Sequence, residues 1–309
     1  SFGGFFLLLT PAAWDGPLEY FQYVLKNASQ FSRWTGVVLF RGQRYDQAIA
    51  PLPRSYLPRM MLYTLPLYFF PLCAVGQLAA AREWFRHPGK CLREPEKLLL
   101  LCATLLWALF MGYVILRQPV IYNGWRHFYF LYGPMLVLAA YGLHGLYRLM
   151  EGKRLASRLL TVLLSLCMAL TGVGIATQHP YQYAYEQPVV RLLTGQDDLE
   201  RDYWNVSVLN ALEALAGQAE GEIVIAPADL WAQAGLENAL YVMEPRHRER
   251  FVEVEEPAKA EYVLSNPTYA LFSGWEPSEE QEEAVTIRAY GRTLMRIDCD
   301  RAWTKEKGE

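Results

Sequence analysis

The sequence is poor in cysteine, and its cysteines form no recognisable cluster. Three of the five lie inside long apolar runs, one in a short connection and one near the end: Cys73, Cys102, Cys167, Cys91 and Cys299. Neither a Cys-x-x-Cys pair nor a Cys/His cluster with metal-ligand spacing occurs, so no metal site is predicted. The part after His179 has a single cysteine and cannot close an internal disulfide.

Common catalytic and binding motifs are also missing. There is no Walker loop, GxGxxG fingerprint, GxSxG elbow or HExxH helix. Nucleotide hydrolysis, dinucleotide redox chemistry and zinc proteolysis therefore lack their usual sequence support. The basic residues are spread among connections rather than gathered in a stripe, so no binding to nucleic acid is predicted.

The net charge is small, at −3, but the two parts of the chain differ in sign. Up to His179 there are 17 Lys and Arg residues against 7 Asp and Glu, whereas the remainder has 12 against 25. A basic first part and an acidic second part indicate two environments rather than one common core.

Apolar residues are abundant, making up 52% of the 309 residues. Four long apolar runs cover roughly 56–80, 98–116, 128–147 and 159–176. Each can cross a hydrocarbon core of about 30 Å at roughly 1.5 Å per residue. A buried soluble helix is the alternative for any one run. Four in succession, each ended by charge, instead predict a polytopic α-helical membrane domain over 1–180.

Residues 1–9 are apolar but too short to span a bilayer, and they lack an initiator Met and the features of a signal peptide. We interpret them as the end of an earlier helix. The membrane domain would then contain about four complete spanning helices plus that end. The chain would accordingly be the C-terminal portion of a longer protein.

Basic residues in the connections predict the orientation of these helices. Connections 81–97 and 148–158 carry most of the cations near the spans, whereas 117–127 has only Arg117 and Arg126. The positive-inside rule therefore makes the first two cytoplasmic and places residues 11–55, 118–125 and the tail outside. The long 11–55 segment also contains cations, but long loops weigh less in this rule.

The tail, residues 181–309, is predicted to be a small extracytoplasmic soluble domain of the α/β or α+β class. A helical pattern covers 230–242. Short β-rich runs predict strands at 222–226, 251–254, 262–264, 284–290 and 293–297, the last two on either side of a turn at Gly291.

The strongest candidate for a binding site is the segment Tyr122-Asn123-Gly124-Trp125-Arg126-His127-Phe128-Tyr129, where an outside connection enters a span. A guanidinium at a membrane face, beside an imidazole and aromatic rings, suits an anionic head group because Arg binds phosphate bidentately. The alternative is an interfacial anchor, with Arg reaching toward water and Trp and Tyr in the aromatic belt.

Two further groups of residues carry the same ambiguity. Arg54 and Tyr56, at the outer end of the first span, provide either a second cationic wall or another interfacial anchor. Tyr181 and the run Asp202-Tyr203-Trp204 provide rings and a carboxylate suited to a sugar. A linker packed on the membrane domain is the alternative for both tail segments.

These segments together resemble the C-terminal half of bacterial membrane glycosyltransferases of the glycosyltransferase-C superfamily, akin to the protein O-mannosyltransferase and aminoarabinose-transferase group. The resemblance rests on Pro51-Leu52-Pro53-Arg54-Ser55-Tyr56-Leu57-Pro58, the 122–128 segment, His179-Pro180-Tyr181-Gln182-Tyr183-Ala184-Tyr185 and Asp202-Tyr203-Trp204. Two residues depart from the family pattern: Arg54 stands where an aromatic residue is expected, and Glu186 where Phe is more familiar.

The resemblance implies an enzyme that moves a sugar from a polyprenyl-phosphate donor to a glycan, lipid or protein acceptor outside the cell membrane. Its catalytic Asp is expected upstream of residue 1, so this fragment alone would be inactive. The implied donor phosphate contacts are Arg126, His127, Arg54 and Tyr56, and the implied sugar or acceptor contacts are Asn123, Trp125, Tyr181, Asp202, Tyr203 and Trp204. A divalent cation could share the phosphate's charge, although no residue here demands one.

Two other classes compete with the enzyme. A membrane anchor could present the acidic tail outside as a domain that binds a ligand or partner protein without catalysis. A transporter half would require a repeat of the broken 58–71 helix, and the sequence has none. An acidic residue in an outside loop after a first span, upstream of this sequence, would distinguish the transferase from the anchor.

Overall fold

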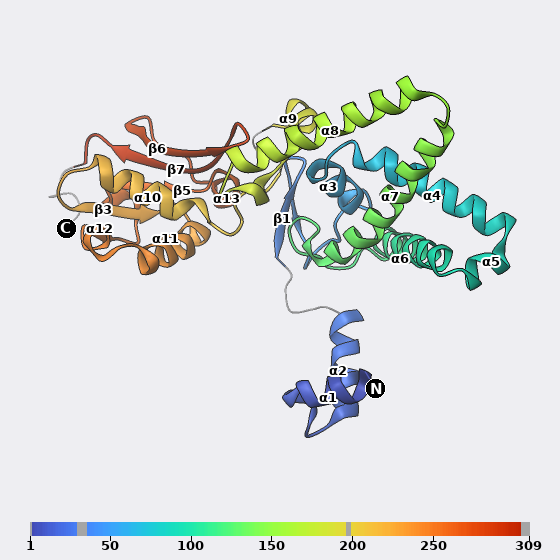
Figure 1. The fold of residues 1–309 in the computed structure, drawn as a ribbon. Coiled ribbons are helices and arrows are strands. Elements are labelled where there is room, and N and C mark those ends of the chain that lie inside the picture. Colours follow the sequence, from blue (N-terminus) through green and yellow to red (C-terminus); the bar gives the residue numbers. More distant parts are fainter. Residues whose placement is uncertain (1, 30–35, 196–198, 304–309) are drawn as a thin grey trace.

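The computed structural model describes residues 2–29, 36–195 and 199–303. A group of helices forms the first part of the chain, and a β-sheet with its own helices forms the last part (Figure 1). The N-terminal elements lie apart from the other helices in this view; they are α1 (Phe2–Leu9), η1 (Pro11–Ala13) and α2 (Pro17–Ser29).

Within the described residues, three helices are long and apolar enough to cross a membrane, judged by length and composition. They are α6 (Pro95–Arg117), η2 (Arg126–Leu131) continued by α7 (Tyr132–Leu149), and α8 (Arg154–Thr177). These three helices coincide with the second, third and fourth apolar runs of the sequence.

The first apolar run, 56–80, is interrupted, as expected for the broken 58–71 helix, but neither of its helices is among the three that are long and apolar enough to cross a membrane. The structure has two helices there, α3 (Tyr56–Thr64) and α4 (Phe69–Arg86), followed by the short α5 (Pro88–Arg93). Leu65 is extended, as expected for a residue before proline, and Pro66 has no N–H with which to continue the helix. The break leaves α3 too short to span a bilayer.

Helices α4 and α7 touch backbone to backbone at two glycines. A Cβ atom built on Gly76 would lie 1.9 Å from the carbonyl oxygen of Leu138, and one on Gly142 would lie 2.0 Å from that of Leu72. Real Cβ atoms do not approach so closely, so the crossing requires glycine at both positions. Because α7 follows directly from η2, this crossing also fixes where the 122–129 segment lies.

A two-stranded hairpin, β1 (Val37–Phe40) with β2 (Gln43–Asp46), ties distant segments together. Phe40 packs edge-on against Tyr56, with ring centroids 4.9 Å apart, and forms an isolated β-bridge with Leu199. Beyond β2, the Gln47 amide donates to the Ile121 carbonyl at 2.8 Å and accepts from its N–H at 3.0 Å. The hairpin therefore links α3, the 118–125 connection and the start of the tail.

The tail forms a five-stranded mixed sheet with strand order β4-β3-β5-β7-β6, in which β3 pairs in parallel with β4 and β5, and β7 pairs antiparallel with β5 and β6. The strands are β3 (Ile223–Pro227), β4 (Phe251–Glu253), β5 (Tyr262–Ser265), β6 (Gln281–Ala289) and β7 (Arg292–Asp300). The helical elements of this part are η3 (Gln182–Ala184), α9 (Pro188–Leu193), α10 (Ser207–Gln218), α11 (Leu230–Val242), α12 (Pro245–Arg248), η4 (Pro257–Lys259) and α13 (Pro267–Ser273).

The five predicted strands and the helix at 230–242 are confirmed. Sequence reasoning missed α10, whose apolar face packs into the core of the sheet through residues such as Val208, Leu212 and Leu215. The mixed sheet agrees with the expected α/β or α+β class.

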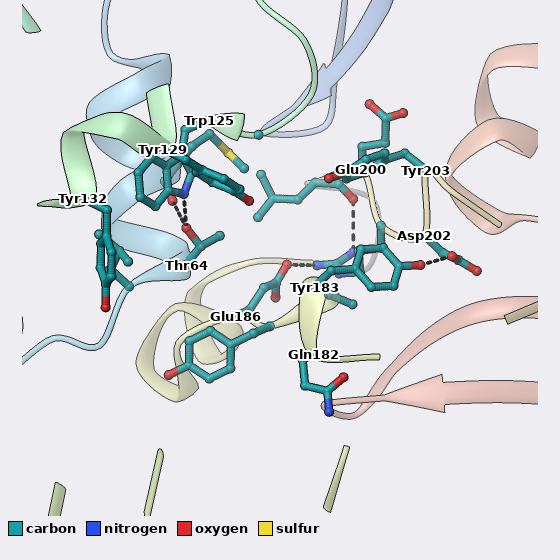
Figure 2. Close-up of a pocket in the computed structure, with 17 residues that line it drawn as sticks. Thr64, Trp125, Tyr129, Tyr132, Gln182, Tyr183, Glu186, Glu200, Asp202 and Tyr203 are labelled. Carbon is teal, nitrogen blue, oxygen red and sulfur yellow. Dashed lines mark hydrogen bonds and ion pairs between the residues drawn. The ribbon is translucent and has the colours of Figure 1, made fainter. Parts of the chain in front are cut away.

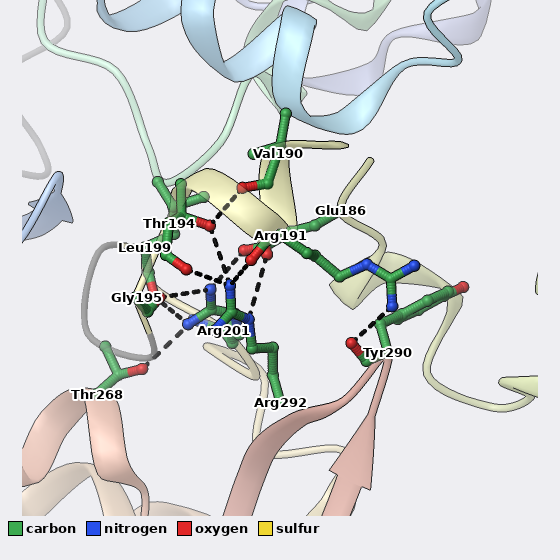
Figure 3. A network of polar contacts seen from close by, with 10 residues as sticks. All are labelled: Glu186, Val190, Arg191, Thr194, Gly195, Leu199, Arg201, Thr268, Tyr290 and Arg292. Atoms are coloured by element: carbon green, nitrogen blue, oxygen red, sulfur yellow. Dashed lines mark hydrogen bonds and ion pairs between the residues drawn. The ribbon is translucent and has the colours of Figure 1, made fainter. Parts of the chain in front are cut away.

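A buried ionic network joins the sheet to the segment before it (Figure 3). Arg201 donates from Nη2 to Oε1 of Glu186 at 2.6 Å, and both residues are buried. Arg292 at the start of β7 places Nε 3.7 Å from the other carboxylate oxygen of Glu186, and its Nη2 donates to the carbonyls of Arg191 and Thr194 at 2.8 and 2.5 Å. Glu186 thus balances two arginines.

Candidate functional site

A cavity of about 380 Å³ lies where the helical part meets the tail. Four separate segments line it, as Figure 2 shows: the end of α3, residues 124–132, residues 182–186 and residues 199–203. Aromatic side chains form much of the wall, including Trp125, Tyr129, Tyr132, Tyr183 and Tyr203. The cavity therefore combines parts of the chain that are far apart in the sequence.

The local backbone explains how the 122–129 segment reaches this cavity. Gly124 has a φ of +72°, a left-handed conformation that glycine adopts without strain, and its N–H donates to the Tyr56 hydroxyl at 2.9 Å. The indole N–H of Trp125 donates to the Thr64 hydroxyl at 2.9 Å. These two bonds to α3 hold the segment in place just before η2 begins at Arg126.

Arg126 holds its guanidinium among three aromatic rings. Its Cζ atom lies 4.4 Å from the centroid of the Tyr122 ring, 5.1 Å from that of Tyr203 and 4.9 Å from that of Trp204. Such contacts attract a cation to the ring face and contribute about 0.5–2 kcal/mol each. The structure thus brings together Arg126 and the Tyr203-Trp204 pair, which the sequence had placed in separate candidate segments.

Several polar atoms around this cage are buried but unused. Within the described ranges, no hydrogen-bond partner reaches Nε or Nη1 of Arg126, Oδ1 of Asn123 or Oε2 of Glu200. Buried polar atoms of native proteins nearly always have a partner, and exceptions call for an explanation such as a ligand. We call Arg126, its three rings, Asn123 and Glu200 the Arg126 cluster.

Glu200 is a functional candidate that sequence reasoning missed. Burial raises its pKa to about 7, against the lowering effect of hydrogen bonds from Tyr269 and Leu39 and of the Arg126 charge. At neutral pH the carboxyl is thus partly protonated and can donate as well as accept a hydrogen bond. The sequence feature that could have identified Glu200 is its position two residues before Asp202, next to the candidate run Asp202-Tyr203-Trp204.

Asp202 is fully occupied by contacts within the protein. It accepts hydrogen bonds from the Val206 N–H at 2.7 Å, from the N–H and hydroxyl of Ser207, and from the Tyr183 hydroxyl (Figure 2). Burial raises its pKa to about 6, although these bonds oppose the increase. Asp202 thus stabilises the turn that leads into α10. Because its oxygens already accept these hydrogen bonds, it is not among the proposed ligand contacts.

The remaining sequence candidates lie outside the Arg126 cluster. Tyr181 is buried, packs with residues of the β6–β7 end and accepts from Asn210 at 2.5 Å. Arg54 is exposed and its Nε lies 3.5 Å from the Gln118 side chain, whereas His127 is exposed and its ring is 4.0 Å from that of Tyr122. Tyr56 is buried under the hairpin and acts through Gly124.

No protein-family model, curated protein or solved structure matches this chain. In the part of the chain that the structure describes, no group of three or more His, Cys, Asp or Glu side chains could hold a metal ion.

Proposed function

We propose that this chain is part of an integral-membrane glycosyltransferase that takes a sugar from a polyprenyl-phosphate donor and transfers it on the outer face of the membrane. The observation that carries the proposal is the Arg126 guanidinium, held by rings beside a cavity, with two nitrogens that have no acceptor among the described residues. A phosphate would supply those acceptors in the bidentate geometry that Arg favours.

The surface of α8 supports the membrane part of this proposal. None of its 24 residues is buried, and large apolar side chains such as Leu159, Leu163 and Leu170 are more than half exposed. Exposure of these apolar side chains costs free energy in water, because each fully exposed Leu forgoes about 1.5–3 kcal/mol of burial. Lipid chains would cover this surface without a protein partner.

A second cavity supports a donor with a long apolar chain. It measures about 690 Å³ and is lined, apart from Gln77, by apolar residues of α3, α4, α6 and α7, among them Leu62, Phe70 and Met111. Neighbouring residues of α3 line the two cavities: Met60 faces the first and Met61 the second. A lipid chain in the larger cavity would accordingly place its phosphate end near the smaller one.

In the proposed reaction, an acceptor hydroxyl attacks the anomeric carbon of the sugar. The bond from that carbon to the phosphate oxygen breaks, and the polyprenyl phosphate leaves with the bonding electron pair. The hydroxyl proton passes to a base, which the family resemblance assigns to an Asp upstream of residue 1. Arg126 would stabilise the negative charge on the leaving phosphate, while Glu200 and Asn123 would hydrogen-bond phosphate or sugar oxygens.

Sugar transfer by the full-length polypeptide tests this proposal. The protein is reconstituted in liposomes with a labelled polyprenyl-phosphate sugar, and wild type is compared with Arg126→Ala and Arg126→Lys. We expect Arg126→Ala to lower transfer about 100-fold or more, as for loss of one oxyanion-binding group. Lys should restore part of the rate, because it keeps the charge and loses the bidentate geometry.

Arg117→Ala is the matched control, since Arg117 is exposed at the end of α6, before the connection that leads to Arg126, and lies outside the cluster. Equal loss in both variants would show a general electrostatic effect instead of a phosphate contact. Donor binding without transfer to any acceptor would favour the non-catalytic alternative, a membrane-anchored binding protein.

A further inference from the structure

A small polar cavity separate from the Arg126 cluster contains two arginines. It measures about 210 Å³ and is lined by Arg41, Arg59, Tyr63, Val190, Leu193 and Thr194. Arg41 comes from the β1–β2 turn, Arg59 from α3 and the last three residues from α9 and its end. It shares no lining residue with the 380 Å³ cavity.

The lining is positively charged, and its charge is not compensated. The lining includes no carboxylate. Among the residues that the structure describes, the guanidinium of neither Arg41 nor Arg59 forms an ion pair or donates a hydrogen bond. Two guanidinium groups in one cavity repel each other, so an anion between them would remove an unfavourable interaction as well as add favourable ones.

The groups behind the cavity add to its positive potential. The Thr194 hydroxyl accepts from Arg292 Nη2 at 3.1 Å and donates to the Val190 carbonyl at 3.0 Å (Figure 3). The network beyond it holds Arg201 and Arg292 against the single carboxylate of Glu186, while the Arg191 guanidinium donates to the Tyr290 carbonyl. Clustered charges of one sign focus the potential inside a concave surface and concentrate the opposite ion there.

The backbone at Arg41 is unusual for an arginine. Arg41 and Gly42 are the two central residues of the hairpin turn, with φ of 55° and 70°, a pattern in which Asn, Asp or Gly is preferred. A side chain with a Cβ atom costs roughly 1–2 kcal/mol in this conformation. Backbone strain of this kind clusters at ligand-binding and active sites.

We propose that this cavity binds a phosphate-type anion through Arg41 and Arg59, at a site distinct from the Arg126 cluster. The cavity has room for a phosphate group, and Arg pairs with its oxygens bidentately. The Tyr63 hydroxyl is a further donor, whereas the Thr194 hydroxyl is already used as a donor within the protein. The anion could belong to a free phosphorylated molecule or to a phospholipid head group.

Titration with inorganic phosphate tests the site. The full-length protein in neutral detergent carries Arg126→Ala, so that binding at the proposed donor site is removed, and affinity is measured by calorimetry. We expect Arg59→Gln to weaken phosphate binding about tenfold, and Arg59→Gln with Arg41→Gly to abolish it. The charge-matched control is Arg288→Gln on an exposed position of β6, which should leave the affinity unchanged.

Arg41→Gly alone keeps the test valid if Arg59→Gln does not fold, because glycine suits the turn and should stabilise the hairpin. A weaker phosphate affinity in a more stable protein supports the site. Unchanged phosphate affinity in both the single and the double variants overturns it. Since Arg126 is absent throughout, failure of this proposal does not bear on the proposed sugar transfer.

A second experiment distinguishes a phospholipid head group from a free phosphorylated molecule as the source of the anion. Nanodiscs of phosphatidylcholine are compared with nanodiscs that also contain phosphatidylglycerol, again for the Arg126→Ala protein. If phosphatidylglycerol blocks phosphate binding only when Arg41 and Arg59 are present, the natural anion is a lipid head group. If phosphate binds equally in both nanodiscs, the anion is a free phosphate compound.

Discussion

Two arginines at the junction of the helices and the tail face opposite situations. Arg201 is buried, and its guanidinium is bonded to Glu186 and to the carbonyls of Leu199 and Gly195. Arg126 is surrounded by aromatic rings, with two nitrogens that reach no acceptor in the described residues. The first is held by partners within the chain, whereas the second keeps hydrogen-bonding capacity for another molecule.

This difference separates a stabilising role from a binding role for the same side chain. A buried ion pair is costly to break, because the remaining charge is left without compensation. A cation against rings keeps its position without using its N–H groups, and therefore remains ready to bind an anion. Substitutions at the two sites should accordingly affect different measurements.

The largest effect is expected from Arg201→Met. It leaves Glu186 buried with only the more distant Arg292, so the free energy of unfolding should fall by about 3–5 kcal/mol. Denaturant unfolding followed by tryptophan fluorescence measures this. Arg246→Met provides the control, because Arg246 and Glu244 form an exposed pair whose loss should cost about 0–1 kcal/mol. Equal effects of the two substitutions would contradict the comparison.

The next effect concerns the pH dependence of stability through Glu200. Its pKa is about 7 in the folded protein and 4.5 when unperturbed, so the folded state binds the proton more tightly. Its contribution to stability is therefore full below pH 4.5 and is lost as pH rises to about 7. In the wild type, the free energy of unfolding should therefore fall by an amount on the order of 2–3 kcal/mol over that range, and Glu200→Gln should remove this fall.

Thermal midpoints between pH 5 and pH 7.5 provide the measurement, with Glu220→Gln as the exposed control. An unchanged pH profile in Glu200→Gln would show that this carboxyl is ionised throughout the range.

Arg126→Ala should affect sugar transfer more than stability, the opposite of what is expected for Arg201→Met. The transfer rate of Arg126→Ala should fall about 100-fold, which corresponds to roughly 2.7 kcal/mol, while the free energy of unfolding changes by far less than in Arg201→Met. The two measurements should be made on the same preparation. A large loss of stability in Arg126→Ala would place this arginine with Arg201 as a structural residue.

The smallest effect is expected from Trp204→Ala. The indole is 63% exposed, so its removal should cost little stability, but it is one of three rings that hold the guanidinium. Loss of an exposed cation–π contact of about 0.5–1 kcal/mol should weaken donor binding two- to fivefold. Trp303→Ala controls for the loss of a partly exposed indole elsewhere in the tail, because the Trp303 indole donates to the Lys259 carbonyl. A 100-fold loss in Trp204→Ala would instead indicate direct contact with the substrate.

Much of the fold could be predicted from local patterns. Alternating β-rich runs and the Gly291 turn gave the strands, and apolar length gave three of the helices. The pattern overestimated 56–80 as a spanning helix, although the prolines of this run already indicated the break that Pro66 imposes on the backbone. It also missed α10, whose apolar positions become meaningful only against the sheet that they cover.

The candidate site was only partly predictable. Arg126, Tyr203 and Trp204 stood out by residue type, but nothing local predicts that they meet. Glu200 and Arg201 look alike in sequence as charged residues in one run. Only the three-dimensional arrangement separates a carboxyl near the Arg126 charge from a guanidinium bonded to Glu186.

The aromatic cage has a consequence for how the chain can be divided. Hydropathy suggests a cut near residue 180, between an apolar and a polar part, yet Arg126 lies on one side of that cut and Tyr203 and Trp204 lie on the other. Separate expression of the two halves would yield fragments that each hold an incomplete cage. Joint expression offers a complementation assay, in which binding returns only when the halves reassemble.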